Sequence, residues 1–233
     1  MPLFALIHSP LVGPLTWKLV AQHLENDGHH VIIPTLRDGD QRAFWEQHAG
    51  SAARAINKLD FHDGWILAGH SGAGPLLPLI GAQLNAPVAA YIFVDAGLPQ
   101  NQASHLDMLK VEIPEVAKHF ETFLKTGGQY PQWQDADLQP LIPDDTLRQR
   151  MLNEIRPRAL SFFTEPLPAP EAWDTIPSGY IQFSEGYAVP AEQARKKGWP
   201  VIEFQAGHFH TLVEPTAVAT ALTKVADQLI KSA

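Results

Sequence analysis

Small residues surround a serine at a point where an apolar segment ends. The run Gly69-His70-Ser71-Gly72-Ala73 directly follows the apolar residues 65–68. A serine hydroxyl is a useful nucleophile only when it is exposed, aimed and deprotonated by a neighbour. A sharp strand-to-helix turn exposes and aims it, and this turn accepts only small side chains two residues before and after the serine. We therefore expect Ser71 to be a nucleophile, in a relaxed G-x-S-x-A form of the G-x-S-x-G pattern.

A histidine near the C-terminus is the expected general base. His208 follows the apolar segment 201–204 and precedes a helix predicted over about 216–231. In an extended segment the side chain of His210 would point the other way, so we expect a pocket or structural role for it. We expect no metal site, because this pair of histidines lacks a third convergent ligand and the chain has no cysteine. His70 is expected to pack beneath the serine turn.

Alternating apolar runs and helical patterns indicate the elements that must position these residues. Strand patterns alternate with helical ones from the N-terminus to residue 94 and resume at 180, which predicts a parallel sheet covered by helices on both faces. Residues 97–178 are richer in Pro, Gln and Asp and show no clear strand, so we expect a small helical cap or lid within one domain spanning 1–233. A helix is predicted over about 72–84. Ligands of such sheets bind beyond the carboxyl ends of the strands.

The chain resembles the α/β-hydrolase superfamily over nearly its whole length, and especially the branch of small plant methylesterases and hydroxynitrile lyases. A serine early in the chain and a histidine in the last loop before the final helix follow the order of that superfamily. The resemblance implies an α/β-hydrolase fold and a triad of serine, histidine and acid. It rests on residues 6–9 with Trp17, 69–73, 91–99, 180–181 with 188–190, and 207–209.

Two carboxylates compete for the role of the triad acid. The resembled branch usually carries its acid at the position that aligns with Gly186 here, so the usual acid is missing. Asp95 ends the predicted strand 88–94, where some haloalkane dehalogenases of the same superfamily carry theirs. Glu185 is adjacent to the vacated position and has a longer reach. We favour Asp95, because a carboxylate at the end of a buried strand needs a partner, and His208 would provide one.

The expected oxyanion hole is also unusual. Such a hole needs two hydrogen-bond donors, and the N–H of Gly72, the residue after the nucleophile, is the expected first donor. The second usually comes from the loop after the first strand, at a position occupied here by Pro10, which has no N–H. Either the N–H of Leu11 or Ser9 completes the hole, or the hole is weak. Ser9 also stands where the hydroxynitrile lyases carry a hydroxyl residue.

Composition narrows the classes of function. The net charge of −8 argues against nucleic acid and anionic membrane surfaces as partners, and no apolar run is long enough to span a bilayer. The N-terminal residues lack a basic region, so we expect a cytoplasmic protein. No G-x-G-x-x-G follows a strand, so no cofactor is expected. The favoured function is a serine hydrolase that cleaves an ester or related acyl bond of a small apolar molecule. The alternatives are lyase chemistry, with His208 as base and Ser9 assisting, and a non-catalytic ligand-binding homologue.

Overall fold

Six apolar runs form the strands of one sheet. The computed structural model describes residues 2–39 and 43–231, so the outermost residues of the predicted domain lie outside it. All neighbouring strands are parallel, in the order β2-β1-β3-β4-β5-β6. The predicted parallel sheet is therefore confirmed. The strands are β1 (Leu3–Ile7), β2 (His30–Ile32), β3 (Trp65–His70), β4 (Val88–Val94), β5 (Ser178–Gln182) and β6 (Val201–Glu203).

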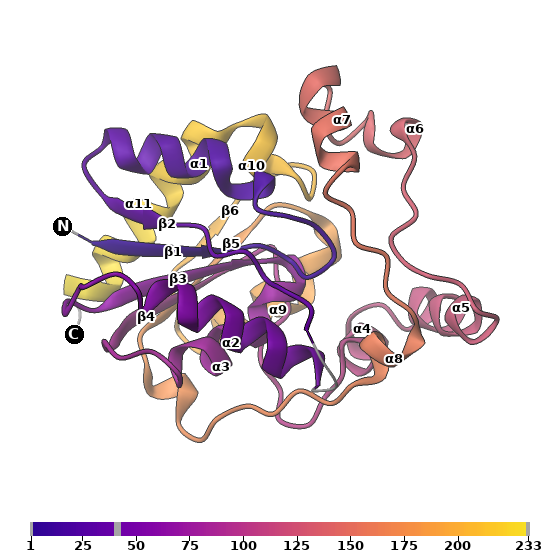
Figure 1. Cartoon of the computed structure of the whole chain (residues 1–233), viewed down its shortest axis with the longest axis horizontal. Helices are drawn as coiled ribbons and strands as arrows, with labels where there is room; N and C mark the ends of the chain where they lie inside the picture. The colour runs from indigo at the N-terminus through magenta and orange to yellow at the C-terminus, as the bar shows by residue number, and fades with distance from the viewer. Residues whose placement is uncertain (1, 40–42, 232–233) are drawn as a thin grey trace.

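Helices cover both faces of this sheet (Figure 1). Successive strand residues point to opposite faces, so a strand that is apolar throughout supplies two cores. Phe4 and Leu6 of β1 pack in a cluster with the helices α1 (Leu15–Asn26) and α11 (Pro215–Lys231). Their neighbours Ala5 and Ile7 pack on the other face.

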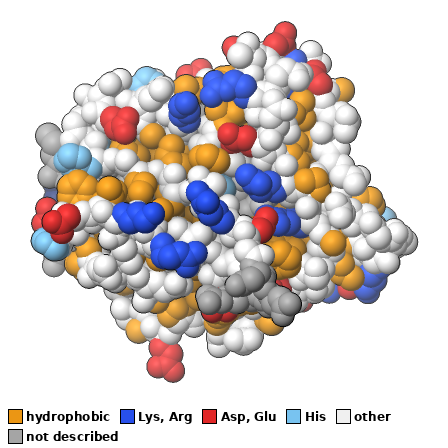
Figure 2. Space-filling view, in the orientation of Figure 1, with side chains coloured by type: hydrophobic (Ala, Val, Ile, Leu, Met, Phe, Trp, Pro, Cys, Tyr) orange, Lys and Arg blue, Asp and Glu red, His pale blue; other side chains and the backbone are white. Residues whose placement is uncertain are grey.

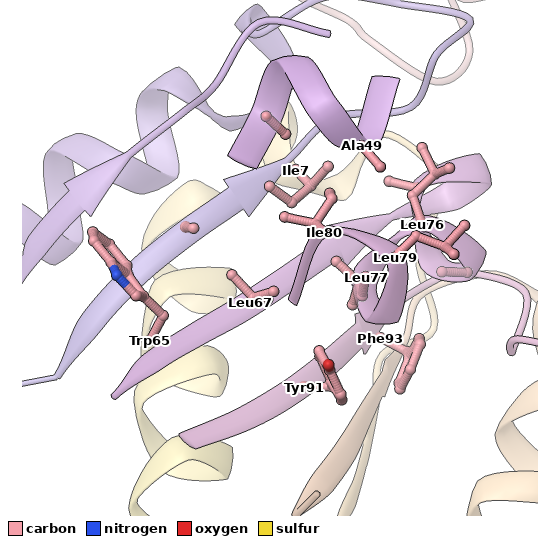
Figure 3. Packing of buried hydrophobic residues seen from close by; sticks show 14 of the residues in the cluster. Ile7, Ala49, Trp65, Leu67, Leu76, Leu77, Leu79, Ile80, Tyr91 and Phe93 are labelled. Atoms are coloured by element: carbon pink, nitrogen blue, oxygen red, sulfur yellow. The ribbon is translucent and has the colours of Figure 1, made fainter. Parts of the chain in front are cut away.

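The second core contains α2 (Phe44–Ile56), α3 (Leu77–Gly81) and α9 (Ala188–Lys196). Figure 3 shows its packing around Leu67 and Tyr91 of the central strands. The central strands β1, β3 and β4 are buried almost completely, and this rigid platform fixes where their carboxyl ends lie. Any side chain placed just beyond those ends is positioned by the two cores.

The strand order reverses beside β1. The chain passes from β1 to β2 on one side and then returns to β3 on the other side of β1. The loops that follow β1 and β3 therefore diverge at the carboxyl edge of the sheet, which is the usual binding site of open parallel sheets.

Between β4 and β5 the chain leaves the sheet. Figure 1 shows this segment beyond the carboxyl ends of the strands, with α4, α5 and α8 in one group and α6 and α7 in another. Within the described residues, the predicted cap segment 97–178 contains helices and isolated bridges until β5 begins at Ser178. Its helices are α4 (His105–Glu112), α5 (Pro114–Lys125), α6 (Asp135–Leu138), α7 (Asp145–Leu152), α8 (Leu160–Thr164) and the 3-10 turn η2 (Trp173–Thr175).

The surface carries charges of both signs despite the negative net charge. Figure 2 shows several basic side chains gathered near the centre of one face, with acidic side chains more scattered around them. No helix among residues 2–39 and 43–231 combines the length and apolar character that crossing a membrane requires.

Candidate active site

The turn after β3 places Ser71 at the carboxyl edge of the sheet. Ser71 has a φ of 59°, in the left-handed region that non-glycine residues rarely adopt. A side chain on Gly69 would contact Leu77, and one on Gly74 would overlap the carbonyl oxygen of Gly97. Ala73 is fully buried. Small residues are therefore needed at this turn, and the closest backbone approach is at Gly74, one residue beyond the position that the sequence pattern indicates.

The helix that follows Ser71 is shorter than we predicted. Instead of one helix over 72–84, a 3-10 turn, η1 (Ser71–Leu76), precedes the short helix α3. Pro75 and Pro78 have no N–H to donate and therefore remove hydrogen bonds that a continuous α-helix would need. Gly72 and Gly74 further lower the helical preference of this stretch.

Asp95 and His208 form a hydrogen-bonded pair. The Nδ1 of His208 lies 2.7 Å from Oδ2 of Asp95. Asp95 follows β4 with a φ of 43° and is completely buried, whereas the His208 side chain keeps 23% of its surface exposed. Because Nδ1–H of His208 donates its hydrogen bond to the carboxylate, Nε2 is left as the basic nitrogen of the ring.

The Asp95 carboxylate accepts three further hydrogen bonds. The backbone N–H groups of Phe183 and Ser184 donate to Oδ1 at 2.8 and 2.9 Å, and the Ser184 hydroxyl donates to Oδ2 at 2.7 Å. Burial alone would raise the pKa of Asp95, but the hydrogen bond and charge of His208 and the donors of Ser184 hold it below its ordinary value. These contacts satisfy a buried carboxylate that would otherwise be costly.

The alternative acid lies elsewhere. Glu185 is exposed at the start of the 3-10 turn η3 (Glu185–Tyr187), and Gly186 beside it is also exposed. The carboxylate that contacts His208 in this structure is that of Asp95.

Tyr187 is a site residue that sequence reasoning missed. Its hydroxyl lies 3.3 Å from Oγ of Ser71. Its ring stacks on that of His208, with ring centroids 5.2 Å apart and planes at 6°. The one available signal was its position directly after Gly186, where the usual acid is absent.

His70 links the serine turn to the histidine loop. It is fully buried, as expected, with its ring 4.5 Å from that of His208 and edge-on to Trp17. Its Nε2–H donates to the carbonyl oxygen of His208 at 2.9 Å. Burial lowers the pKa of His70 to about 3, so it is neutral and holds the loop without carrying charge.

The loop after β1 brings Ser9 and Leu11 to the same edge. Ser9 is buried, and its Oγ lies 3.2 Å from where a Cβ on Gly72 would stand. The N–H of Leu11 donates to the Ser9 Oγ at 3.3 Å, so this N–H is already engaged within the loop. The Ser9 hydroxyl can still donate its own hydrogen.

Contacts on both sides hold this loop. His8 accepts the Leu36 N–H at Nε2 and donates from Nδ1 to the Ser9 carbonyl at 2.8 Å. Burial lowers the pKa of His8 to about 4, which keeps it neutral. From the cap segment, the Arg158 guanidinium donates to the Pro10 carbonyl at 3.2 Å. The half-buried Arg158 is thus part of the scaffold of the loop.

One cavity of about 440 Å³ lies between the sheet edge and the cap segment, and the residues that line it include Ser9, Leu11, Ser71, Gly72 and His208. This volume suits a small molecule. Apolar and aromatic side chains form most of the wall, chiefly Val12, Met108, Leu109, Val116, Phe120, Tyr130, Trp133, Phe162, Phe163 and Phe209.

No cluster of three or more His, Cys, Asp or Glu side chains within residues 2–39 and 43–231 is arranged to hold a metal ion. His210 begins the helix α10 (His210–Val213), and its ring packs against Phe183 and Phe204, which is the structural one of the two roles that we expected. The residues brought together at the cavity are therefore a hydroxyl, an imidazole with a buried carboxylate, and hydrogen-bond donors.

Solved structures share this fold. An extracellular alpha/beta-hydrolase from a Paenibacillus species, which has structural and functional homology to tobacco salicylic acid binding protein 2, superposes with a TM-score of 0.77 at 22% identity. The match covers 97% of this chain and 99% of that one. Polyneuridine aldehyde esterase gives a TM-score of 0.73 at 17% identity, over 97% and 99% of the two chains. Tomato methylketone synthase I, as an H243A variant bound to beta-ketoheptanoate, gives 0.71 at 14%, over 98% of each.

Sequence comparison leads to the same family. No match was found among curated protein sequences. The family model described as alpha/beta hydrolase family matches residues 5–221, which is most of the chain. The protein therefore belongs to the alpha/beta hydrolase family.

Proposed function

We propose that this protein is a serine hydrolase that cleaves an ester or related acyl bond of a small, mainly apolar molecule. The observation that carries the proposal is the 2.7 Å hydrogen bond between the buried Asp95 carboxylate and His208, beside the same cavity as Ser71. A histidine oriented in this way, lining the same cavity as a partly exposed serine, supports activation of that serine as a nucleophile.

In the proposed reaction, Nε2 of His208 removes the proton of Ser71, and the serine oxygen attacks the carbonyl carbon. Asp95 holds the imidazole in the tautomer that has a basic Nε2 and stabilises the imidazolium that forms. The imidazolium then returns the proton to the leaving alcohol, which leaves an acyl group on Ser71. Water, deprotonated by the same histidine, attacks the acyl carbon; the bond from that carbon to the Ser71 oxygen then breaks, the imidazolium returns the proton to the serine, and the acid is released.

The negative oxygen of the tetrahedral intermediate needs two donors. We assign the first to the N–H of Gly72 and the second to the hydroxyl of Ser9. Ser9 is preferred to the N–H of Leu11 because that N–H already donates to the Ser9 oxygen. The same bond orients the Ser9 hydroxyl, which lies close to Gly72. This arrangement compensates for the missing N–H at Pro10.

The cavity supports a small apolar substrate, because its volume is about 440 Å³ and its wall is largely aromatic. The family membership supports hydrolysis, and polyneuridine aldehyde esterase and the Paenibacillus hydrolase are relatives in fold whose names describe esterase or hydrolase activity.

Labelling with a fluorophosphonate probe tests the proposal. We expect wild-type protein to be labelled, and Ser71→Ala and His208→Ala to lose labelling at a temperature where denaturation curves show both variants folded. Glu185→Gln, at an exposed position, serves as a folded control that retains both residues. A panel of short acyl esters then measures turnover. A well-folded wild type that is neither labelled nor active on any ester would overturn the proposal and favour a ligand-binding protein.

One observation favours a second candidate, lyase chemistry. The Ser9 hydroxyl lies in the cavity at the position where hydroxynitrile lyases carry a hydroxyl residue. In that reaction His208 would remove the hydroxyl proton of a cyanohydrin, and cyanide would leave as the carbonyl forms. Cyanide release from mandelonitrile, measured beside ester hydrolysis, separates the two. Release that depends on His208 without ester turnover would favour the lyase.

A further inference from the structure

One face of the helix α4 lines the candidate active-site cavity. Four residues of this helix line the cavity: His105, Met108, Leu109 and Glu112. Their spacing of i, i+3, i+4 and i+7 places them on a single helical face. Two of these side chains are apolar, and burial lowers the pKa of His105 to about 4, so it is neutral at physiological pH. Glu112 is the only acidic residue among the described residues that line this cavity.

The Glu112 carboxylate is not explained by the fold. Within residues 2–39 and 43–231 it has neither a hydrogen bond nor an ion pair, and burial raises its pKa to about 7. The neighbouring Lys110 pairs instead with Glu121 at 3.1 Å. No Lys or Arg is among the described residues that line the cavity. A carboxylate without a partner in an apolar wall costs stability, which is typical of a group retained for a ligand.

Glu112 lines the same cavity as the reacting groups. Its Oε1 lies 3.7 Å from where a Cβ on Gly97 would stand, and Gly97 packs against the η1 turn that carries Ser71. Burial raises the pKa of Tyr187, and the charges of Asp95 and Glu112 raise it further, so the Glu112 carboxylate is within electrostatic reach of the hydroxyl that contacts Ser71. A substrate whose carbonyl is at Ser71 has room within this one cavity to reach Glu112.

We propose that Glu112 forms a subsite for a cationic nitrogen group on the ester substrate of Ser71. The proposal rests on the proposed function and names the substrate class that the site prefers: esters with an ammonium group a few bonds from the carbonyl. An ammonium group would pair with the carboxylate and favour its ionised form. Phe120 and Tyr130, aromatic side chains of the same cavity, are suited to the alkyl groups and positive charge of such a nitrogen.

Three matched esters test the subsite. The cationic ester is 4-nitrophenyl 4-(trimethylammonio)butanoate, the neutral isostere is 4-nitrophenyl 5,5-dimethylhexanoate, and the anionic counterpart is the glutaric acid mono-4-nitrophenyl ester. The measured quantity is kcat/KM for each ester, after subtraction of Ser71→Ala background. We expect wild type to prefer the cationic ester to the neutral one. We expect Glu112→Gln to lower that preference about tenfold, equivalent to about 1.4 kcal/mol, and to leave the neutral ester within about threefold.

Glu115→Gln is the matched control, because it removes the same charge from an exposed position three residues away. It is expected to leave the preference unchanged. An equal preference in wild type and Glu112→Gln, or a wild-type preference for the anionic ester, would overturn the subsite.

A binding measurement separates failure of the subsite from failure of the proposed function. Calorimetric titration of the cationic and neutral esters into Ser71→Ala, with and without Glu112→Gln, does not require turnover. If wild type hydrolyses none of the esters but Ser71→Ala binds the cationic ester about tenfold better because of Glu112, the hydrolase proposal fails and the subsite stands. If the esters are hydrolysed without any effect of Glu112 on binding or kcat/KM, the subsite fails and the hydrolase proposal stands.

Discussion

Replacing Asp95 with asparagine separates the two candidate acids. Asparagine has nearly the same shape as aspartate, but one of its terminal groups is an NH2 that cannot accept a hydrogen bond. The amide oxygen can keep the two backbone donors that now reach Oδ1, from Phe183 and Ser184. The NH2 group would then face the Ser184 hydroxyl and Nδ1 of His208, which both donate to Oδ2 in the wild type.

The catalytic effect follows from the imidazole tautomer. To avoid two opposed N–H groups, His208 must place its proton on Nε2 and accept at Nδ1, and it can then no longer deprotonate Ser71. A serine triad altered in this way loses about 10⁴-fold in kcat, equivalent to about 5 kcal/mol. We expect Asp95→Asn to lower kcat/KM by roughly 10³–10⁴-fold. The loss of charged hydrogen bonds is partly offset by the removal of a buried charge, so we expect stability to fall by only about 1–3 kcal/mol.

The assay is ester turnover and the rate of fluorophosphonate labelling, at a temperature where denaturation curves show both variants folded. Glu185→Gln is the control, because it makes the same chemical change on an exposed side chain. We expect it to retain wild-type activity within about twofold. The assignment of Asp95 is refuted if Asp95→Asn keeps more than a tenth of the activity and Glu185→Gln abolishes it.

Three further outcomes test the account of the site. Glu112 has an ordinary pKa of 4.5 and a folded-state pKa of about 7, so the folded protein holds a proton that the unfolded chain has lost, and stability falls as pH rises through that window. The free energy of unfolding lost over this pH window is about 1–3 kcal/mol, because partial exposure of the carboxylate weakens the effect. In urea unfolding, Glu112→Gln should therefore be as stable as wild type near pH 4 and more stable by that amount at pH 8. Equal stabilities of the two proteins at pH 8 would contradict the burial argument. Gly74→Ala should lower stability in thermal unfolding by about 2 kcal/mol or more, because its methyl group would overlap the carbonyl oxygen of Gly97. In the control Gly186→Ala, the nearest atom to the added methyl group is the Ser184 hydroxyl oxygen at 3.8 Å, so stability should change by less than about 0.5 kcal/mol. Ser184→Ala should cost about 1.5–3 kcal/mol through the lost hydroxyl bond to a charged carboxylate, and an unchanged melting temperature would show that this bond contributes nothing.

The periodic features of the sequence predicted the fold well. Buried parallel strands require near-continuous apolar runs and their covering helices require a 3.6-residue repeat, so both can be recognised locally. The serine turn can also be recognised from a few neighbouring residues, because its strained backbone requires small residues around Ser71. The helix predicted over 72–84 was too long, because the prediction relied on apolar spacing and did not account for the hydrogen bonds lost at Pro75 and Pro78.

The sequence by itself therefore determined the sheet, the order of its elements and the candidate nucleophile and base, since these depend on patterns within a few residues. Only the tertiary structure brought Asp95 to His208, because their contact joins residues 113 positions apart and depends on the spatial order β4-β5-β6. The positions of Tyr187 beside Ser71 and of Glu112 in the cavity wall were likewise decided by packing. The polar partners of a side chain depend on which strand ends and helices meet in space, and local sequence patterns do not specify which of them meet.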